Sequence, residues 1–238
     1  MNEQLSLRRY RRDCLIGALG GLLMLAGDLC LSVIPASAGD SGLFLREAYL
    51  GGGYEPWRLP LLLVTGLIGM ALGFFTVRAS YQQIRPQYRK MRLAVLIGGV
   101  IYLASAGAIH ALIGSLADWT SALGPALGRE QASALVMGQY ARIMPALLPG
   151  YAGMLLLIFG SAFAVLTKKT ILPRRMLAFH LIIVELVLLL IPDVRQALGA
   201  RVSTWDFVLS QGSGNAALAI WMLANAIWAG RQIKREEN

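Results

Sequence analysis

Residues 14–35, CLIGALGGLLMLAGDLCLSVIP, form an apolar run that is long enough to cross a membrane. A hydrocarbon layer roughly 30 Å thick takes about 20 helical residues to span. A cluster of arginines within residues 8–12 precedes the run, and one carboxylate, Asp28, interrupts it. The stretch therefore predicts a membrane-spanning helix that carries a single acidic side chain.

The same stretch also resembles a secretory signal peptide. A basic start and an apolar run lead to Ala36-Ser37-Ala38, which has the small residues of a cleavage site. The run is longer than the apolar region of about 7 to 15 residues that such signals carry, and it contains Asp28. We therefore expect this segment to be retained as a helix.

Five further apolar runs follow, and the composition agrees with a lipid-embedded chain. Of the 238 residues, 56% are hydrophobic and only 15% are charged, which is outside the ordinary soluble range. We predict an all-α bundle of six transmembrane helices in a single domain, residues 1–238. The expected spans are about 14–35, 60–77, 93–116, 150–167, 176–191 and 215–230. Glycines four apart in the first two spans predict that these two helices pack closely.

Two stretches between the runs have helical patterns of their own. Residues 43–50, in the first long connection, predict a short helix that ends at Gly51-Gly52-Gly53. Residues 129–144 have apolar residues on one side and predict an amphipathic helix along the membrane interface. Pro145 and Pro149 either separate this helix from the fourth span or kink it into that span.

The basic residues predict the orientation. All Lys and Arg fall on the expected inner side except Arg46, Arg58, Arg129, Arg142, Arg195 and Arg201. This positive-inside asymmetry places both termini in the cytoplasm and predicts a multi-pass protein of a bacterial plasma membrane. The net charge of +9 then belongs to loops at an anionic membrane face, so a nucleic-acid partner is not expected. Membrane lipid is an expected partner, and homo-oligomerisation stays open.

Ionisable side chains within the spans mark candidate sites, because they are costly in lipid. Counted from the basic flanks at about 1.5 Å per residue, Asp28 and Asn215 lie about 24 Å deep and His110 about 27 Å deep. Glu185 lies about 15 Å deep, near the midplane. His180 is about one turn from the cytoplasmic boundary, so we expect it at the membrane interface.

We expect these groups to line one outward-facing pocket for a small lipophilic or cationic ligand. The candidate catalytic residues are Asp28, Glu185 and His110, because two carboxylates and an imidazole in an apolar setting suit general acid and base chemistry. The expected ligand-binding residues are Tyr102, Trp221, Asn215, Glu47, Glu55 and Asp193. Isomerisation or cyclisation of a lipophilic substrate is one reaction of this kind.

Two other classes of function stay open. A proton-coupled transporter of small solutes would use Asp28 and Glu185 as proton sites. In a non-catalytic receptor or assembly subunit, the polar groups would only hold helices together. The sequence contains no HExxH, CxxC or GxSxG motif and no phosphate-binding loop, so we expect neither a metal nor a cofactor. Whether the protein is an enzyme is left undecided.

Overall fold

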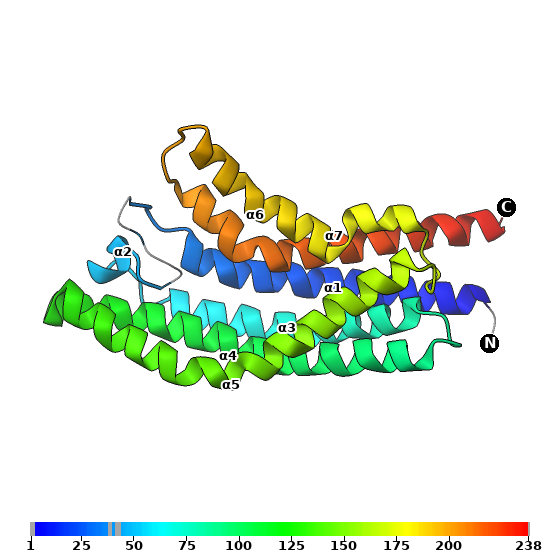
Figure 1. The fold of residues 1–238 in the computed structure, drawn as a ribbon, viewed down its shortest axis with the longest axis horizontal. Coiled ribbons are helices and arrows are strands. Elements are labelled where there is room, and N and C mark those ends of the chain that lie inside the picture. Colours follow the sequence, from blue (N-terminus) through cyan, green and yellow to red (C-terminus); the bar gives the residue numbers. More distant parts are fainter. Residues whose placement is uncertain (1–2, 38–39, 41–43, 238) are drawn as a thin grey trace.

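The computed structural model describes residues 3–37, 40 and 44–237, and these residues contain helices but no β-strand. The elements are α1 (Glu3–Ser32), α2 (Glu47–Leu50), α3 (Arg58–Gln83), α4 (Arg89–Leu127), α5 (Arg129–Leu166), the 3-10 helix η1 (Arg174–Phe179), α6 (Leu181–Ala197) and α7 (Thr204–Glu237). Successive long helices run in alternating directions (Figure 1). The chain is thus a helical bundle with up-and-down connectivity.

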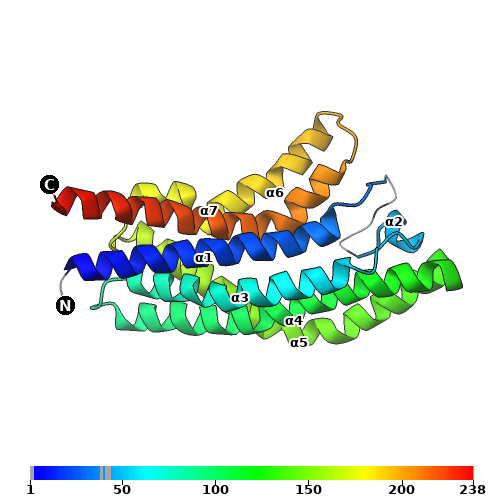
Figure 2. The same ribbon diagram turned by 180° about the vertical axis from the view of Figure 1, so that it is seen from behind.

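Both ends of the chain lie at one end of the bundle, together with the connections 84–88 and 167–173 (Figure 1). We call this the basic end, because the clusters of Lys and Arg lie there. The opposite end holds the connection 33–57 with α2, the turn at Gly128 and the connection 198–203, as the view from behind also shows (Figure 2). Gly128 has a φ of +80°, which a residue with a side chain rarely adopts.

Within the described residues, five helices are long and apolar enough to cross a membrane: α1, α3, α4, α5 and α7. The prediction of an all-helical protein with several membrane-spanning helices is therefore confirmed. The predicted fifth span corresponds to α6, which has only 17 residues. It begins later than expected, because the chain first forms η1 and then turns at His180, whose backbone is extended.

Helices α4 and α5 are longer than the expected spans. Only Gly128 separates them, so residues 129–144 form the first turns of α5 and not a separate interfacial helix. Pro145 and Pro149 lie inside this helix, which is curved in Figure 1. Membrane helices tolerate such prolines, because neighbouring groups satisfy the carbonyls that proline leaves without a partner.

Small residues bring two helix pairs into close contact. A Cβ placed on Gly20 of α1 would lie 2.8 Å from the carbonyl oxygen of Gly69 on α3. In the same way, a Cβ on Gly98 of α4 would lie 2.8 Å from the carbonyl oxygen of Gly153 on α5. The predicted close packing of α1 on α3 is confirmed, and it follows the small-residue packing of membrane helices.

The main contacts join α5 to α4, α4 to α3, α3 to α1, α1 to α7 and α7 to α6. Apart from α7, α6 makes only limited contacts, with α5 and η1, and it leans away from the rest of the bundle (Figure 1). Large apolar side chains are exposed along it, among them Ile183, Leu186, Val187, Leu190 and Val194. In a membrane, lipid chains would cover these side chains.

Candidate functional site

Three polar side chains from three helices meet inside the bundle: Asp28 of α1, His110 of α4 and Asn215 of α7. Asn215 Nδ2 donates to Asp28 Oδ2 at 2.7 Å. His110 Nδ1 lies 3.5 Å from Asp28 Oδ1, and His110 Nε2 lies 3.5 Å from Asn215 Nδ2. We call these three residues the Asp28 triangle.

One protonation state is compatible with all three contacts of the Asp28 triangle. A neutral His110 with its proton on Nδ1 carries an N–H on the side of Asp28, and its Nε2 accepts the second N–H of Asn215. Both partners of the carboxylate are then neutral. Among the described residues, no arginine or lysine pairs with Asp28, so an ionised Asp28 would have no fixed positive charge beside it.

The Asp28 triangle is buried, but not completely. Asp28 is 5% exposed and Asn215 is 9% exposed, whereas the side chain of His110 is 17% exposed. Helices α4 and α7 are not one of the main contact pairs of the bundle, so His110 and Asn215 meet where these two helices have little direct packing. A carboxylate in such a place is costly in lipid, and this makes it a candidate functional group.

Glu185 of α6 approaches the same part of α7. A Cβ placed on Gly214 would lie 3.3 Å from Glu185 Oε1, so the carboxyl group of this half-buried residue rests against α7 one residue before Asn215. Glycine at this position leaves room for the carboxyl group. The structure thus brings the three candidate acid and base residues, Asp28, His110 and Glu185, to one region.

The two predicted aromatic ligands are packed into the bundle. Tyr102 packs against a cluster that contains Met24 and Met70. Trp221 is 2% exposed, and its ring lies on the imidazole of His180 with 4.6 Å between the centroids. Both side chains are therefore packed against other protein side chains. Ligand binding by either residue stays a prediction.

The predicted acidic ligands make other contacts. Glu47 pairs with Arg129, and Glu55 pairs with Arg58 at 2.9 Å. Asp193 is exposed on α6. No described contact joins these three carboxylates to the Asp28 triangle. Among the described residues, no group of three His, Cys, Asp or Glu side chains is arranged to hold a metal ion.

His180 is fully buried between helices, and its expected depth near the membrane interface stays a prediction. Its Nδ1 accepts from the backbone N–H of Ile182 at 3.4 Å and so caps α6. Its Nε2 lies 3.0 Å from the hydroxyl of Ser161 on α5. The turn between η1 and α6 carries the ring inward, and no local hydrophobic pattern signals this turn.

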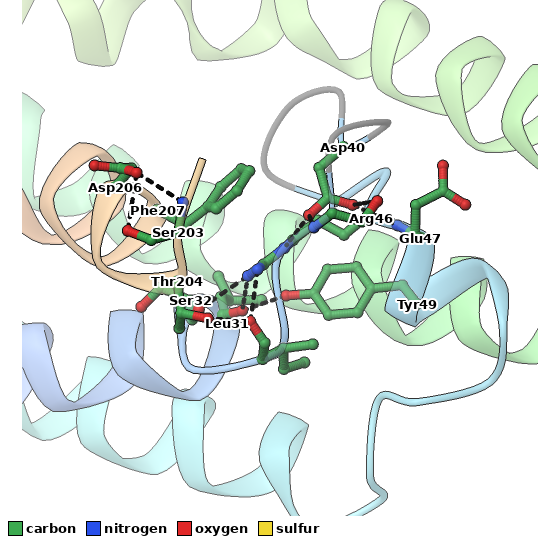
Figure 3. Close-up of polar contacts among 12 residues, drawn as sticks. Leu31, Ser32, Asp40, Arg46, Glu47, Tyr49, Ser203, Thr204, Asp206 and Phe207 are labelled. Atoms are coloured by element: carbon green, nitrogen blue, oxygen red, sulfur yellow. Dashed lines mark hydrogen bonds and ion pairs between the residues drawn. The ribbon is translucent and has the colours of Figure 1, made fainter. Parts of the chain in front are cut away.

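A second buried polar cluster, which the sequence did not reveal, encloses the end of α1 (Figure 3). Arg46 is 0% exposed, and its guanidinium donates to the carbonyl oxygens of Ser32 at 2.9 Å and Ile34 at 2.7 Å. The Tyr49 hydroxyl donates to the carbonyl of Leu31. These groups satisfy carbonyls that a helix C-terminus leaves without partners.

The guanidinium is also held from other sides. Its carbon lies 4.1 Å from the centroid of the Phe207 ring on α7, and Asp40 Oδ2 lies 3.4 Å from its Nε. Burial raises the pKa of Tyr49 to about 12, although the neighbouring Arg46 acts in the opposite direction. We call Asp40, Arg46, Tyr49 and Phe207 the Arg46 clasp.

The Arg46 clasp is connected to the Asp28 triangle through the last turn of α1. The hydroxyl of Ser32 donates to the carbonyl oxygen of Asp28 at 2.9 Å, and the carbonyl of Ser32 accepts from Arg46. A cation at a helix C-terminus is favourable, because the helix dipole places partial negative charge there. The clasp therefore fixes the end of the helix that carries Asp28.

Comparison with known proteins identifies a family but no activity. Residues 1–227 match the model of a family described as "Family of unknown function (DUF6796)", so the chain belongs to this family. No curated protein and no solved structure matches the chain. The function must therefore be argued from the geometry.

Proposed function

We propose that this member of the DUF6796 family binds a small lipophilic molecule with a cationic or hydrogen-bond-donating group at the Asp28 triangle. One observation carries the proposal: the Asp28 carboxyl group is buried in a membrane-spanning bundle, and its described side-chain partners are an amide and an imidazole, with no arginine or lysine among them. An unpaired charge in lipid is unfavourable. A ligand cation beside Asp28 would remove that penalty.

The position of α6 supports access from the lipid. Beyond its first turns, α6 diverges from α5 (Figure 1), and Glu185 lies on α6 beside the residue that precedes Asn215. A lipophilic molecule would pass between α5 and α6, meet Glu185 first and then reach Asp28. His110, the most exposed member of the triangle, then holds a proton donor or acceptor against the bound group.

We also propose six membrane crossings with cytoplasmic termini in a bacterial plasma membrane. The alternating helix directions and the basic clusters at one end support this orientation (Figure 1). Leu198, at the opposite end, is 83% exposed, and both native cysteines are buried. In intact cells, an impermeant maleimide should label Leu198→Cys but not Glu236→Cys; the reverse pattern would overturn the orientation.

Carbodiimide labelling tests whether Asp28 is reachable from lipid. In nanodiscs at mildly acidic pH, lipophilic dicyclohexylcarbodiimide should modify Asp28, and Asp28→Asn should abolish that adduct. Asp206 is the matched control, because it is also 5% exposed but bonds Ser203 and pairs with Arg195. Absence of an Asp28 adduct, in protein that is labelled there once unfolded, would contradict access from the lipid.

Protection by a ligand mimic tests the proposed chemistry. Dodecyldimethylamine should slow the labelling of Asp28 roughly tenfold, which corresponds to about 1.4 kcal/mol. Dodecanol, which has the same chain and no positive charge, is the control and should protect much less. Equal protection by both molecules would show that the site selects only for apolar chains.

Proton-coupled transport is a second candidate, because two carboxylates flank one short stretch of α7. Glu185 rests against Gly214, and Asp28 is bonded to Asn215. Protons would then pass between these carboxylates along one path. In liposomes, Glu185→Gln should abolish solute-driven proton flux if this candidate is correct, and flux equal to that of the wild type would exclude Glu185 as the coupling site.

A further inference from the structure

A groove between α1 and α7 at the basic end combines two kinds of surface. Its volume is about 630 Å³, and its charged part is formed by Arg8, Arg11, Arg12, Arg231, Lys234 and Glu237. Leu15 of α1 and Ile227 of α7, which are 44% and 55% exposed, line its apolar part. One groove therefore offers cations next to exposed hydrocarbon.

Most of the positive charge in this groove has no partner. Glu237 forms an ion pair with Arg8 at 2.7 Å. Arg12 lies 3.6 Å from Asp13, which also pairs with Arg78. Within the described part of the chain, no carboxylate pairs with Arg11, Arg231 or Lys234. These three side chains are exposed and remain available to an anion.

Arg11 is held across the surface of α7. A Cβ placed on Gly230 would lie 3.2 Å from Arg11 Nε, so the glycine lets the guanidinium lie close to the α7 backbone. In this position Arg11 is brought next to the basic residues at positions 231 and 234, and the three come from two helices. A planar guanidinium matches the geometry of phosphate oxygens.

The apolar part of the groove continues away from the charges. On α1, Leu15 is followed on the same face by Leu19 and Leu22, which are 51% and 48% exposed. On α7, Ile227 is preceded by Leu223 and Ile220 on the same face, which are 39% and 40% exposed. Two apolar tracks thus lead from the basic groove along the membrane-spanning part of α1 and α7.

From this arrangement we infer that the groove between α1 and α7 binds an anionic phospholipid. The phosphate lies among Arg11, Arg231 and Lys234, and the acyl chains follow the apolar tracks toward the middle of the membrane. A soluble phosphate would use only the charged part, whereas a phospholipid also covers the exposed leucines and isoleucines. Basic pockets between membrane helices are known to bind anionic head groups.

Native mass spectrometry of the full chain tests this site. The protein is incubated with equal amounts of phosphatidylglycerol and phosphatidylcholine with identical acyl chains. Wild type should retain phosphatidylglycerol in preference. The double variant Arg11→Gln/Lys234→Gln should lower that retention roughly tenfold or more, because each basic residue near an anionic lipid contributes on the order of 1 kcal/mol.

The matched control is Arg89→Gln/Lys90→Gln, which removes the same charge from the same end of the molecule. Both residues are exposed at the start of α4, outside the groove. Retention should match that of the wild type. Equal losses in the two double variants would show diffuse attraction between charges and would overturn the site, as would a wild type with no lipid preference.

Competition separates a lipid from a soluble phosphate. Short-chain phosphatidylglycerol should displace the retained lipid, whereas glycerol 3-phosphate at the same concentration should not. Leu15→Ser, which keeps every charge in the groove, should weaken retention. Displacement by glycerol 3-phosphate as effective as that by the lipid would show that the chains contribute nothing, and this result would overturn the inference.

Discussion

The Arg46 clasp and the Asp28 triangle are both buried polar clusters that contact α1, the clasp at its C-terminal end and the triangle about one helical turn before that end. In the clasp, the charge of Arg46 faces Asp40 and the carbonyls of Ser32 and Ile34. In the triangle, the charge of Asp28 faces an amide and an imidazole. Since only the first charge is matched by an opposite charge, the clasp has the character of a structural element, and the triangle has the character of a binding site.

The two clusters also differ in the contacts that surround them. The clasp lies at the opposite end, where Phe207 covers the guanidinium and Asp40 accepts from the backbone of Glu47 at 2.7 Å. The triangle joins α1 and α7, which pack closely, to α4, and its His110 is partly exposed. Changes in the clasp should therefore affect folding, and changes in the triangle should affect binding.

The largest expected effect on stability is that of Arg46→Met. Methionine fills a similar volume, but it removes the buried cation that pairs with Asp40 and one hydrogen-bond donor from each of three carbonyl groups. Breaking a buried ion pair by removing one partner costs about 3 to 5 kcal/mol. Unfolding in mixed micelles with increasing denaturing detergent should show a loss of this size in the free energy of unfolding.

Arg129→Met is the control for this prediction. Arg129 also lies at the opposite end and pairs with Glu47, but its side chain is 59% exposed. An exposed pair contributes about 0 to 1 kcal/mol, so this variant should stay close to the wild type. Similar losses in the free energy of unfolding for Arg46→Met and Arg129→Met would show that the buried pair of the clasp contributes no more stability than an exposed pair.

A smaller effect is expected for Tyr49→Phe, which removes the hydroxyl that donates to the Leu31 carbonyl. A net contribution of about 1 kcal/mol is typical of one hydrogen bond. The pKa of Tyr49 is about 12 in the folded protein, whereas an unfolded tyrosine ionises near its ordinary value of about 10. The unfolded chain thus loses this proton first as the pH rises.

Wild-type stability should consequently decrease between about pH 10 and pH 12, because the folded state keeps the Tyr49 proton in that range. The contribution is fully present below pH 10. Thermal unfolding of both proteins across this range measures the difference. A Tyr49→Phe variant whose stability has the same pH dependence as that of the wild type would contradict the assignment of this pH dependence to Tyr49.

The depth of a residue along its helix was predictable from the sequence, whereas the direction in which its side chain points around the helix was not. Because the rise per residue is constant, counting from the basic flanks placed Asp28, His110 and Asn215 in one layer. The structure brings these three together, with hydrogen bonds from Asn215 to Asp28 and between Asn215 and His110 and with His110 within 3.5 Å of Asp28. The sequence also indicated Trp221 as a ligand-binding residue, but it did not show that Trp221 lies against His180.

The Arg46 clasp was not predictable, because burial of Arg46 depends on contacts distant in the sequence. By local pattern, Arg46 is one more charge in a polar connection. Only the folded chain brings it against the end of α1 and the Phe207 ring. The sharp turn at His180 and the continuity of α5 through Pro145 likewise depend on packing against neighbouring helices.

The smallest effect on stability is expected for Asp28→Asn, and this variant separates the two clusters most sharply. An asparagine at this position keeps an oxygen that accepts from Asn215, and hydrogen bonds between membrane helices contribute on average only about 0.6 kcal/mol. The free energy of unfolding, measured as for Arg46→Met, should therefore change by less than about 1 kcal/mol. This variant lacks the carboxyl group that the carbodiimide labels, so protection from labelling cannot be measured. Binding of dodecyldimethylamine is instead measured directly by equilibrium dialysis and should be lost. A loss of stability as large as that of Arg46→Met would mean that Asp28, like Arg46, holds the fold together, and the unmatched charge would no longer indicate a ligand.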